Sequence, residues 1–183
     1  MKQLINLLLM IFLLVNFSCG RSYREEDLTQ EIKTEQDSIR ERQALIKENL
    51  EKTNQIVIAK ELEKIRTFIE RNSWQMQEKE GVFIQILDKG NGKAFQDGER
   101  ISLDYNCKLL SGEEVYNSKT DGKIHIKIGT QSDCPLGLQK AVSNLYHKCK
   151  ARIIVPSSLA YGLSGDGNKV PRAATLIYEI EID

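Results

Sequence analysis

Glycine and proline are absent from residues 21–80, although the chain contains 12 glycines and three prolines in 183 residues. All three prolines, and every glycine except Gly20, lie at residue 81 or later. These two residue types are the main interrupters of regular structure, so their uneven distribution predicts a domain boundary near residues 80–81.

Charge of one sign is not in excess, because 26 Lys and Arg balance 26 Asp and Glu. Without a net field the chain has no general attraction for nucleic acid or for an anionic surface, and we predict no nucleic-acid partner. Histidine is scarce as well. His125 and His147 lie far apart and no Cys-x-x-Cys motif accompanies them, so the sequence predicts no metal site. It also gives no sign of a soluble cofactor.

Cysteine is sparse. Beyond Cys19 the chain holds Cys107, Cys134 and Cys149. One disulfide with one thiol left over would fit an oxidising compartment. Three unpaired cysteines acting as small buried apolar side chains would fit equally well. The sequence does not choose between these alternatives.

No apolar run long enough to span a bilayer follows Cys19. Before it, Lys2 and the apolar residues 4–15 have the form of a short export signal. A cysteine placed directly after such a run, between two small residues, resembles the lipobox of bacterial lipoproteins, in which that cysteine is acylated and becomes the new N-terminus. The resemblance implies a signal peptide at residues 1–18, a lipid on Cys19 and an extracytoplasmic protein anchored to a bacterial membrane in the cell envelope. An ordinary signal peptide with a coincidental cysteine is the alternative.

Residues 19–80 are predicted to form a charged, mostly helical stalk, because the good helix formers Glu, Lys, Gln and Arg dominate them. Apolar residues recur there at helical intervals: Leu28, Ile32, Ile39, Ile46, Ile58, Leu62, Ile65 and Ile69. Interruptions are expected near residues 53–54 and 72–73. The more apolar segment 56–74, which includes Trp74, is expected to dock on the following domain or on a partner stalk.

The stalk has two candidate roles. It can hold the second region away from a membrane, or its thin apolar seam can pair with another copy to form a homodimer. A solvated helix with partial disorder over residues 21–49 is a third interpretation.

Residues 81–183 are rich in predicted strands, at 81–87, 101–105, 124–128, 150–155 and 175–182. Residues 136–145 have helical spacing, and Pro135 stands where it can begin a helix. The predicted fold class is therefore α+β, with one antiparallel sheet carrying a single short helix.

Residues 155–162 read V-P-S-S-L-A-Y-G, and residues 170–181 read V-P-R-A-A-T-L-I-Y-E-I-E. With these motifs the second region resembles the FKBP-type peptidyl-prolyl isomerases, whose pattern is I-P-x-x-L-A-Y-G followed by I-P-P-x-A-x-L-x-F-x-V-E. Tyr105, residues 109–112 and residues 128–129 match earlier landmarks. The resemblance implies an FKBP-like antiparallel sheet wrapped on one short helix over residues 81–183, and prolyl isomerase activity.

The resemblance also implies a set of site residues. The catalytic positions would be Tyr105, Leu138, Tyr161 and Tyr178. The substrate-binding positions would be Val115, Tyr116, Asn117, Ile124, Cys134, Pro135 and Val170. Packing is an equal alternative for Ile124 and Tyr178, because apolar residues on sheet faces are usually core. Tyr161, in a loop next to glycine, is favoured as a site residue.

The chain departs from the family pattern at the pocket. The family's aromatic-acid pair after the residue-112 turn becomes Tyr116-Asn117 if one residue is inserted, or Val115-Tyr116 without the insertion, and either way the carboxylate is missing. Leu138 replaces the usual tryptophan. Pro135 stands where a backbone N–H commonly holds a substrate carbonyl, and proline has none. These changes are similar to those of a divergent branch, the gliding-motility-associated FKBP-type lipoproteins of Bacteroidetes.

Three hypotheses follow for function. The first is an anchored isomerase acting on proline-containing exported or envelope proteins. The second is a non-catalytic FKBP-like module that binds or assembles an envelope complex through the same groove. The third is a general folding helper in which paired stalks bring two domains around an unfolded client.

Overall fold

The computed structural model describes the backbone of residues 2–130 and 132–183, and the side chains of residues 29–130 and 132–183. The elements follow one another as α1 (Lys2–Arg71), β1 (Gln77–Lys79), β2 (Val82–Asp88), β3 (Arg100–Leu109), β4 (Glu114–Asn117), α2 (Ser118–Asp121), β5 (Ile124–Lys127), α3 (Leu136–Ser143), β6 (Lys150–Val155), the 3-10 turn η1 (Ser157–Leu159) and β7 (Leu176–Ile182). The chain divides into an N-terminal unit, Met1–Gln55, and a C-terminal unit, Ile56–Asp183.

Helix α1 is continuous, so the predicted interruption near residues 53–54 is wrong. No glycine or proline lies there, and the Thr53 hydroxyl donates a 2.8 Å hydrogen bond to the Asn49 carbonyl within the helix. The predicted interruption at residues 72–73 is confirmed. The helix ends at Arg71, and Ser73 takes a left-handed conformation with φ 53°.

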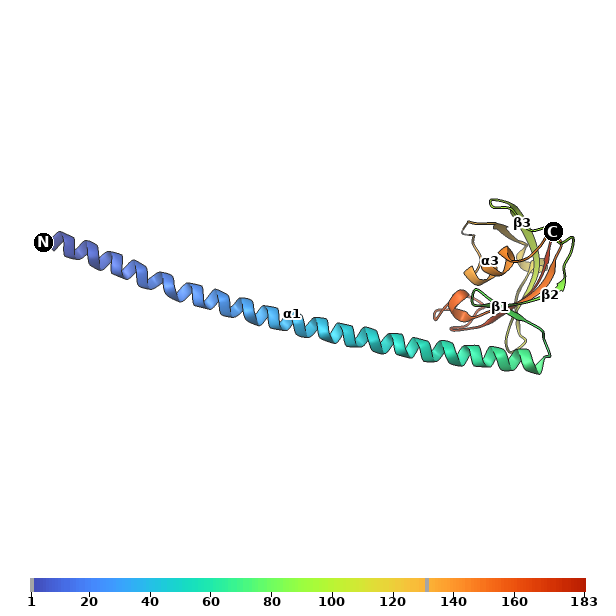
Figure 1. Ribbon diagram of the computed structural model, residues 1–183, viewed down its shortest axis with the longest axis horizontal. Helices are drawn as coiled ribbons and strands as arrows, with labels where there is room; N and C mark the ends of the chain where they lie inside the picture. The colour runs from blue at the N-terminus through green and yellow to red at the C-terminus, as the bar shows by residue number, and fades with distance from the viewer. Residues whose placement is uncertain (1, 131) are drawn as a thin grey trace. The chain divides into compact units, whose positions relative to one another are not determined.

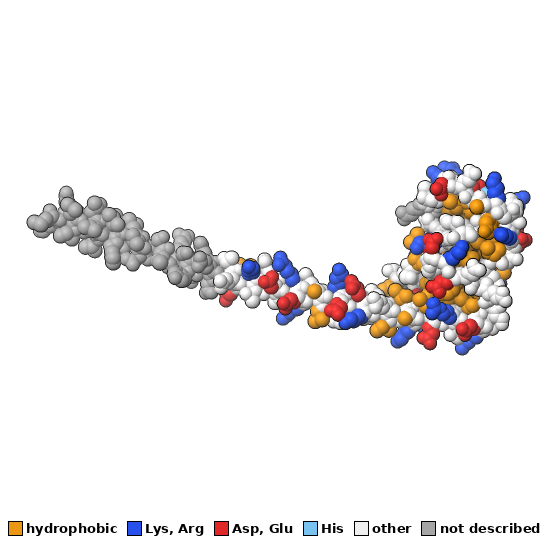
Figure 2. All heavy atoms as spheres, in the orientation of Figure 1, with side chains coloured by type: hydrophobic (Ala, Val, Ile, Leu, Met, Phe, Trp, Pro, Cys, Tyr) orange, Lys and Arg blue, Asp and Glu red, His pale blue; other side chains and the backbone are white. Residues whose placement is uncertain are grey.

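The surface of α1 between residues 29 and 55 is polar. Acidic and basic side chains alternate along it, with separate hydrophobic side chains between them (Figure 2). Ile32, Ile39 and Ile46 are all exposed. In the part of the chain that the structure describes, no helix combines the length and apolar character needed to cross a membrane. Cys19 and the predicted signal peptide lie outside the residues whose side chains are described.

The predicted antiparallel α+β arrangement is confirmed. The strand order is β1-β2-β6-β7-β3-β4, with β5 also pairing with β3, and every pairing is antiparallel. Helix α3 lies against one face of this sheet (Figure 1). The short elements β1, β4, α2 and η1 carry little sequence pattern and were not predicted.

Alternate strand residues divide the hydrophobic core into two layers, because successive side chains in a strand point to opposite faces. On β6, Ile153 packs in the same cluster as Leu138 of α3, which we call the inner cluster. Its neighbour Ile154 packs with Ile65 of α1 in a second cluster, the outer cluster. The sheet is therefore covered on both faces within the C-terminal unit.

The outer cluster confirms that residues 56–74 dock on the domain that follows them. Ile65 is completely buried there. Phe68 and Trp74 meet edge to face with ring centroids 5.3 Å apart, and the Arg152 guanidinium lies 3.9 Å from the Trp74 ring centroid. Such a cation over an indole adds an electrostatic attraction to the apolar burial.

The three cysteines in the described part of the chain carry free thiols. Cys107 and Cys149 are buried in the inner cluster, and Cys134 packs against it. This agrees with the interpretation of cysteines as small apolar core side chains.

Candidate active site

The structure gathers most of the predicted site residues on the inner face of the sheet. Four of them are buried in the inner cluster: Val115, Leu138, Val170 and Tyr178. Four more are partly buried and pack against it: Tyr105, Tyr116, Ile124 and Cys134. They come from β3, β4, β5, β7, α3 and two loops, so only the folded sheet brings them together.

Leu138 and Tyr178 form the floor of this arrangement. Leu138 is 0% exposed and Tyr178 is 2% exposed, so other side chains cover the floor. Gly137 allows α3 to approach strand β6 closely, because a Cβ at this position would lie only 2.4 Å from Val155 Cγ1. Tyr105 stands beside Tyr178 with ring centroids 6.3 Å apart. Burial raises the pKa of Tyr178 well above its usual value, so its hydroxyl stays neutral.

Tyr161 lies at the rim, in the loop that follows η1, and is 36% exposed. The next residue fixes the loop on both sides. The Gly162 N–H donates to the Ser157 carbonyl at 2.8 Å, and the Gly162 carbonyl accepts from the Ala173 N–H at 3.0 Å. Partial burial, followed by the nearby Asp166, raises the pKa of Tyr161 to about 12. At neutral pH its hydroxyl is therefore protonated and can donate a hydrogen bond.

A β-bulge lies where the sequence left the alignment open. Cys107 of β3 pairs with Tyr116, but the next residue, Lys108, pairs with Glu114, so Val115 is the extra residue. The bulge places one extra residue in β4, and which residue takes the family's aromatic position stays a prediction. Val115 itself is buried.

Asn117 is occupied by local structure. Its side-chain oxygen accepts from the N–H groups of Lys119 and Thr120, which caps α2, and its amide donates to Glu114 at 2.5 Å. Its polar atoms are thus engaged by neighbours, and its predicted contact with substrate stays a prediction.

Asp166 brings a carboxylate to this region from the loop before β7, which sequence analysis did not foresee. The Tyr116 hydroxyl donates to Asp166 Oδ2, and Asp166 Oδ1 accepts from the backbone N–H groups of Asn168 at 2.9 Å and Val170 at 2.8 Å. Burial acts to raise the pKa of Asp166, but these hydrogen bonds outweigh it and hold the pKa below its usual value. The sequence signal was the G-D-G-N turn at residues 165–168, which does not reveal a partner 50 residues away.

Cys134 and Pro135 form the entry to α3. Pro135 is buried and directly precedes the helix, as predicted. The Cys134 carbonyl accepts a 2.7 Å hydrogen bond from Gln139, whose amide also donates to Ser132 at 3.0 Å. Burial raises the pKa of the Cys134 thiol to about 11, so at neutral pH it is an uncharged wall residue.

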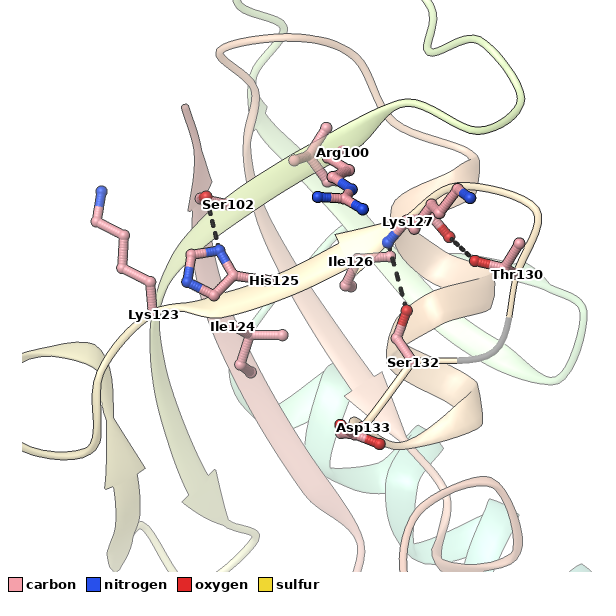
Figure 3. A pocket seen from close by; sticks show the side chains of 11 residues that line it. Arg100, Ser102, Lys123, Ile124, His125, Ile126, Lys127, Thr130, Ser132 and Asp133 are labelled. Atoms are coloured by element: carbon pink, nitrogen blue, oxygen red, sulfur yellow. Dashed lines mark hydrogen bonds between the residues drawn. The ribbon is translucent and has the colours of Figure 1, made fainter.

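A groove of about 640 Å³ opens beside Ile124, on the β5 side of the inner cluster (Figure 3). It is lined by residues 100–102 and 123–127, together with Thr130, Ser132 and Asp133. In Figure 3 the His125 ring meets Ser102, at 2.9 Å, and Ser132 Oγ accepts from the Lys127 N–H, at 3.4 Å. Isoleucines of the inner cluster form part of the lining, and the charged side chains there include more cations than anions.

Comparison with known proteins gives a consistent result. The family model for the FKBP-type peptidyl-prolyl cis-trans isomerase matches residues 91–183. The isomerase FkpA of Escherichia coli K12 is 28% identical over 102 residues, which is 56% of this chain and 37% of that protein. An FK506-binding protein of Neisseria meningitidis is 29% identical over 104 residues, which is 56% of this chain and 94% of that protein. The chain thus spans well under half the length of the FkpA relative.

Solved structures agree on the fold. The N-terminal domain of FKBP42 from Arabidopsis thaliana superposes with a TM-score of 0.54 and 25% identity, covering 59% of this chain and 89% of that one. The crystal structure of Escherichia coli FkpA superposes with a TM-score of 0.56 over 80% of this chain and 69% of that one, and at 21% identity it supports the fold alone. All the predicted catalytic and substrate-binding residues lie inside the matched family region.

Proposed function

The chain belongs to the FKBP-type peptidyl-prolyl cis-trans isomerase family, and we propose that it catalyses rotation about X–Pro bonds in proline-containing exported polypeptides. The observation that carries this proposal is the inner cluster, against which the aromatic residues Tyr105 and Tyr116 pack together with Ala160, the residue before Tyr161.

The chemistry suits such a wall. Rotation about an X–Pro bond breaks amide resonance, which opposes it with a barrier of about 20 kcal/mol. The twisted amide has a less polar carbonyl than the planar, well-hydrated one. A dry apolar environment therefore favours the twisted state, and binding energy lowers the barrier. The reaction breaks no covalent bond, so no nucleophile is required.

Each site residue has its own role in this proposal. Tyr105, Tyr116, Ile124 and Cys134 are the partly buried walls against which a proline ring can pack. The Tyr161 hydroxyl donates a hydrogen bond that fixes the peptide backbone. Pro135 offers no N–H, so one anchoring hydrogen bond of about 0.5–1.5 kcal/mol is missing, and we expect weak to moderate turnover.

A protease-coupled assay on X-Pro tetrapeptides tests the proposal, with the full chain beside Tyr161→Phe. We expect measurable turnover in the native chain and a several-fold lower kcat/KM in the variant, because phenylalanine keeps the ring and removes the donor. Turnover equal to that of buffer at high protein concentration would refute catalysis.

A second candidate, a non-catalytic binding or assembly module of an envelope complex, is favoured by the covered floor. Other side chains cover Leu138 and Tyr178 almost completely, so binding at the rim alone is an alternative to catalysis. A blank isomerase assay, together with saturable binding of a proline peptide that Tyr161→Phe weakens, would select this candidate.

We further propose that Cys19 carries a lipid and anchors the protein to the bacterial membrane, outside the cytoplasm. The support is the sequence of the leader, with Lys2, the apolar residues 4–15 and the small neighbours of Cys19. Labelling with radioactive palmitate in a bacterial host should mark the native chain but not Cys19→Ser. A native chain that remains unlabelled, or that keeps residues 1–18, contradicts the anchor.

The stalk is proposed to pair with a second copy. Ile32, Ile39 and Ile46 are exposed and recur every seven residues, which is the spacing of a coiled-coil seam. Sedimentation of the full chain should show a dimer that Ile39→Lys dissociates, whereas Lys47→Glu, away from the seam, should leave it intact. A native chain that sediments as a monomer removes this proposal and, with it, the paired-domain folding helper.

A further inference from the structure

The carboxylate of Glu61, near the end of α1, accepts three hydrogen bonds within the C-terminal unit. Oε1 accepts from the Ser157 N–H at 2.7 Å and from Thr175 Oγ1 at 2.5 Å, and Oε2 accepts from Ser157 Oγ at 2.8 Å. Ser157 and Thr175 are each only 6% exposed. Because buried polar groups need partners, the carboxylate satisfies three donors that have little access to water.

These donors sit at the two ends of one loop. Ser157 is the first residue of η1, and Pro156 before it gives no side-chain cap. The N–H groups at the start of a helical turn lack carbonyl acceptors, so Glu61 supplies the cap from a different element. Thr175 directly precedes β7. One carboxylate therefore holds both ends of residues 157–175.

Backbone hydrogen bonds close this arrangement into a ring. The Gly162 N–H donates to the Ser157 carbonyl at 2.8 Å, and the Ala173 N–H donates to the Gly162 carbonyl at 3.0 Å. The ring runs from Glu61 through Ser157, Gly162 and Ala173 to Thr175, and back to Glu61. Tyr161 is bonded directly to Gly162, so the position of the ring determines where the tyrosine stands.

We propose that Glu61 is a positioning residue of the isomerase site, which sets the loop that carries Tyr161, Asp166 and Val170. The proposal rests on the proposed function but concerns a residue outside the matched family region, which begins at residue 91. Ile65, one turn further along α1 and fully buried, holds the helix in place, so the carboxylate has a fixed origin.

The test compares the full chain with Glu61→Gln and with Glu63→Gln, a matched change at an exposed glutamate on the same helix. Glutamine keeps the size of Glu61 but removes the charge that strengthens its three bonds. We expect faster amide hydrogen exchange at Gly162 and Ala173, with exchange in β3 and β7 unchanged. We also expect kcat/KM to fall about tenfold, mostly in kcat, as the loss of one or two such hydrogen bonds predicts. Glu63→Gln should match the native chain.

Three outcomes overturn the proposal. The first is amide exchange at Gly162 and Ala173 equal to that of the native chain. The second is exchange that rises uniformly with that of β3 and β7, which indicates only global destabilisation. The third is a loosened loop with unchanged kinetic constants. If Glu61→Gln does not fold, Thr175→Val removes one donor at nearly constant shape, and Thr175→Ser, which keeps the hydroxyl, should restore native exchange and kcat. If the native chain shows no turnover, the proposed catalysis fails, and exchange at Gly162 and Ala173 decides separately whether Glu61 sets the loop.

Discussion

Isoleucine side chains are exposed in one stretch of helix α1 and buried in another. Ile46, in the N-terminal unit, is 59% exposed, whereas Ile65, in the C-terminal unit, is 0% exposed. Both follow the same helical spacing in a polar sequence. The difference lies in what each meets, because Ile65 packs against Phe83, Ile154 and Ile177 on the outer face of the sheet.

Helical periodicity therefore identifies an apolar face of a helix but does not show whether other residues bury that face. Residues 29–55 form a helix whose apolar side chains are exposed and whose ion pairs, such as Arg40 with Asp37, are also exposed. Residues 56–71 bury apolar side chains and place Glu61 against Ser157 and Thr175. The second stretch is thus structurally part of the C-terminal unit.

The largest expected effect comes from truncating the buried isoleucine. Ile65→Ala should lower the free energy of unfolding of the C-terminal unit by about 2–5 kcal/mol, because it removes buried methyl groups and leaves a cavity. Ile39→Ala, on the exposed stretch, should change it by less than about 0.5 kcal/mol. Urea unfolding followed by Trp74 fluorescence measures both. Equal effects of the two substitutions would mean that α1 does not pack on the sheet.

A smaller effect is expected at the polar edge of the same contact. Arg152 donates to Glu179 Oε1 through two nitrogens, at 3.0 and 2.7 Å, while its guanidinium lies over Trp74. Arg152→Lys keeps the charge but loses the planar fork and the stacking, and should cost about 1–2 kcal/mol of unfolding free energy.

Lys150 provides the control for this measurement on the same strand. It forms an exposed pair with Glu181 at 3.0 Å, and such pairs contribute little. Lys150→Ala should therefore cost about 0.5 kcal/mol or less by the same urea unfolding. If Lys150→Ala costs as much as Arg152→Lys, the stacking on Trp74 has no special role.

The smallest expected effect concerns pH. Hydrogen bonds hold the pKa of Asp166 below its ordinary value of about 3.9. A carboxyl with a lowered folded pKa stabilises the fold above its unfolded pKa, and this stabilisation disappears as the pH falls through the folded pKa. Asp166→Asn should therefore lower the free energy of unfolding by about 0.5–1 kcal/mol at neutral pH, a figure reduced for solvent screening. Below about pH 4 the difference between the variant and the native chain should become smaller.

Unfolding measured between pH 7 and pH 3 checks this prediction. Asp37→Asn, which changes the exposed pair with Arg40 in the other stretch of α1, is its control and should leave the curve unaltered. An Asp166→Asn curve parallel to that of the native chain would show that the Tyr116–Asp166 contact does not depend on ionisation.

Much of the C-terminal unit could be predicted because its signals are local. Alternation at residues 101–105 and 124–128 placed β3 and β5, and the A-Y-G motif placed Tyr161 in a loop. The amino-acid sequence alone could not show whether one residue is inserted near Val115, because a bulge is a property of two paired strands. The predicted interruption near residues 53–54 was wrong because the Thr53 hydroxyl can form a hydrogen bond inside a helix as well as at its end.

The two carboxylates were beyond sequence analysis. Asp166 meets Tyr116 across 50 residues, and Glu61 meets Ser157 across 96 and Thr175 across 114. A carboxylate in a polar stretch has the same local signature whether it faces water or a distant hydroxyl. The missing family acid at Asn117 therefore suggested a site without a carboxylate, whereas the folded chain brings one from the opposite loop.

The helix, the strands, the antiparallel α+β fold and the family could be predicted from the order of residues, because backbone preference, side-chain alternation and ordered motifs act over short stretches. The buried face of α1, the carboxylates that reach the site loop and the close packing of the floor could not be predicted in this way. Those outcomes depend on contacts between residues far apart in the chain, whose free energies exist only once the sheet has formed.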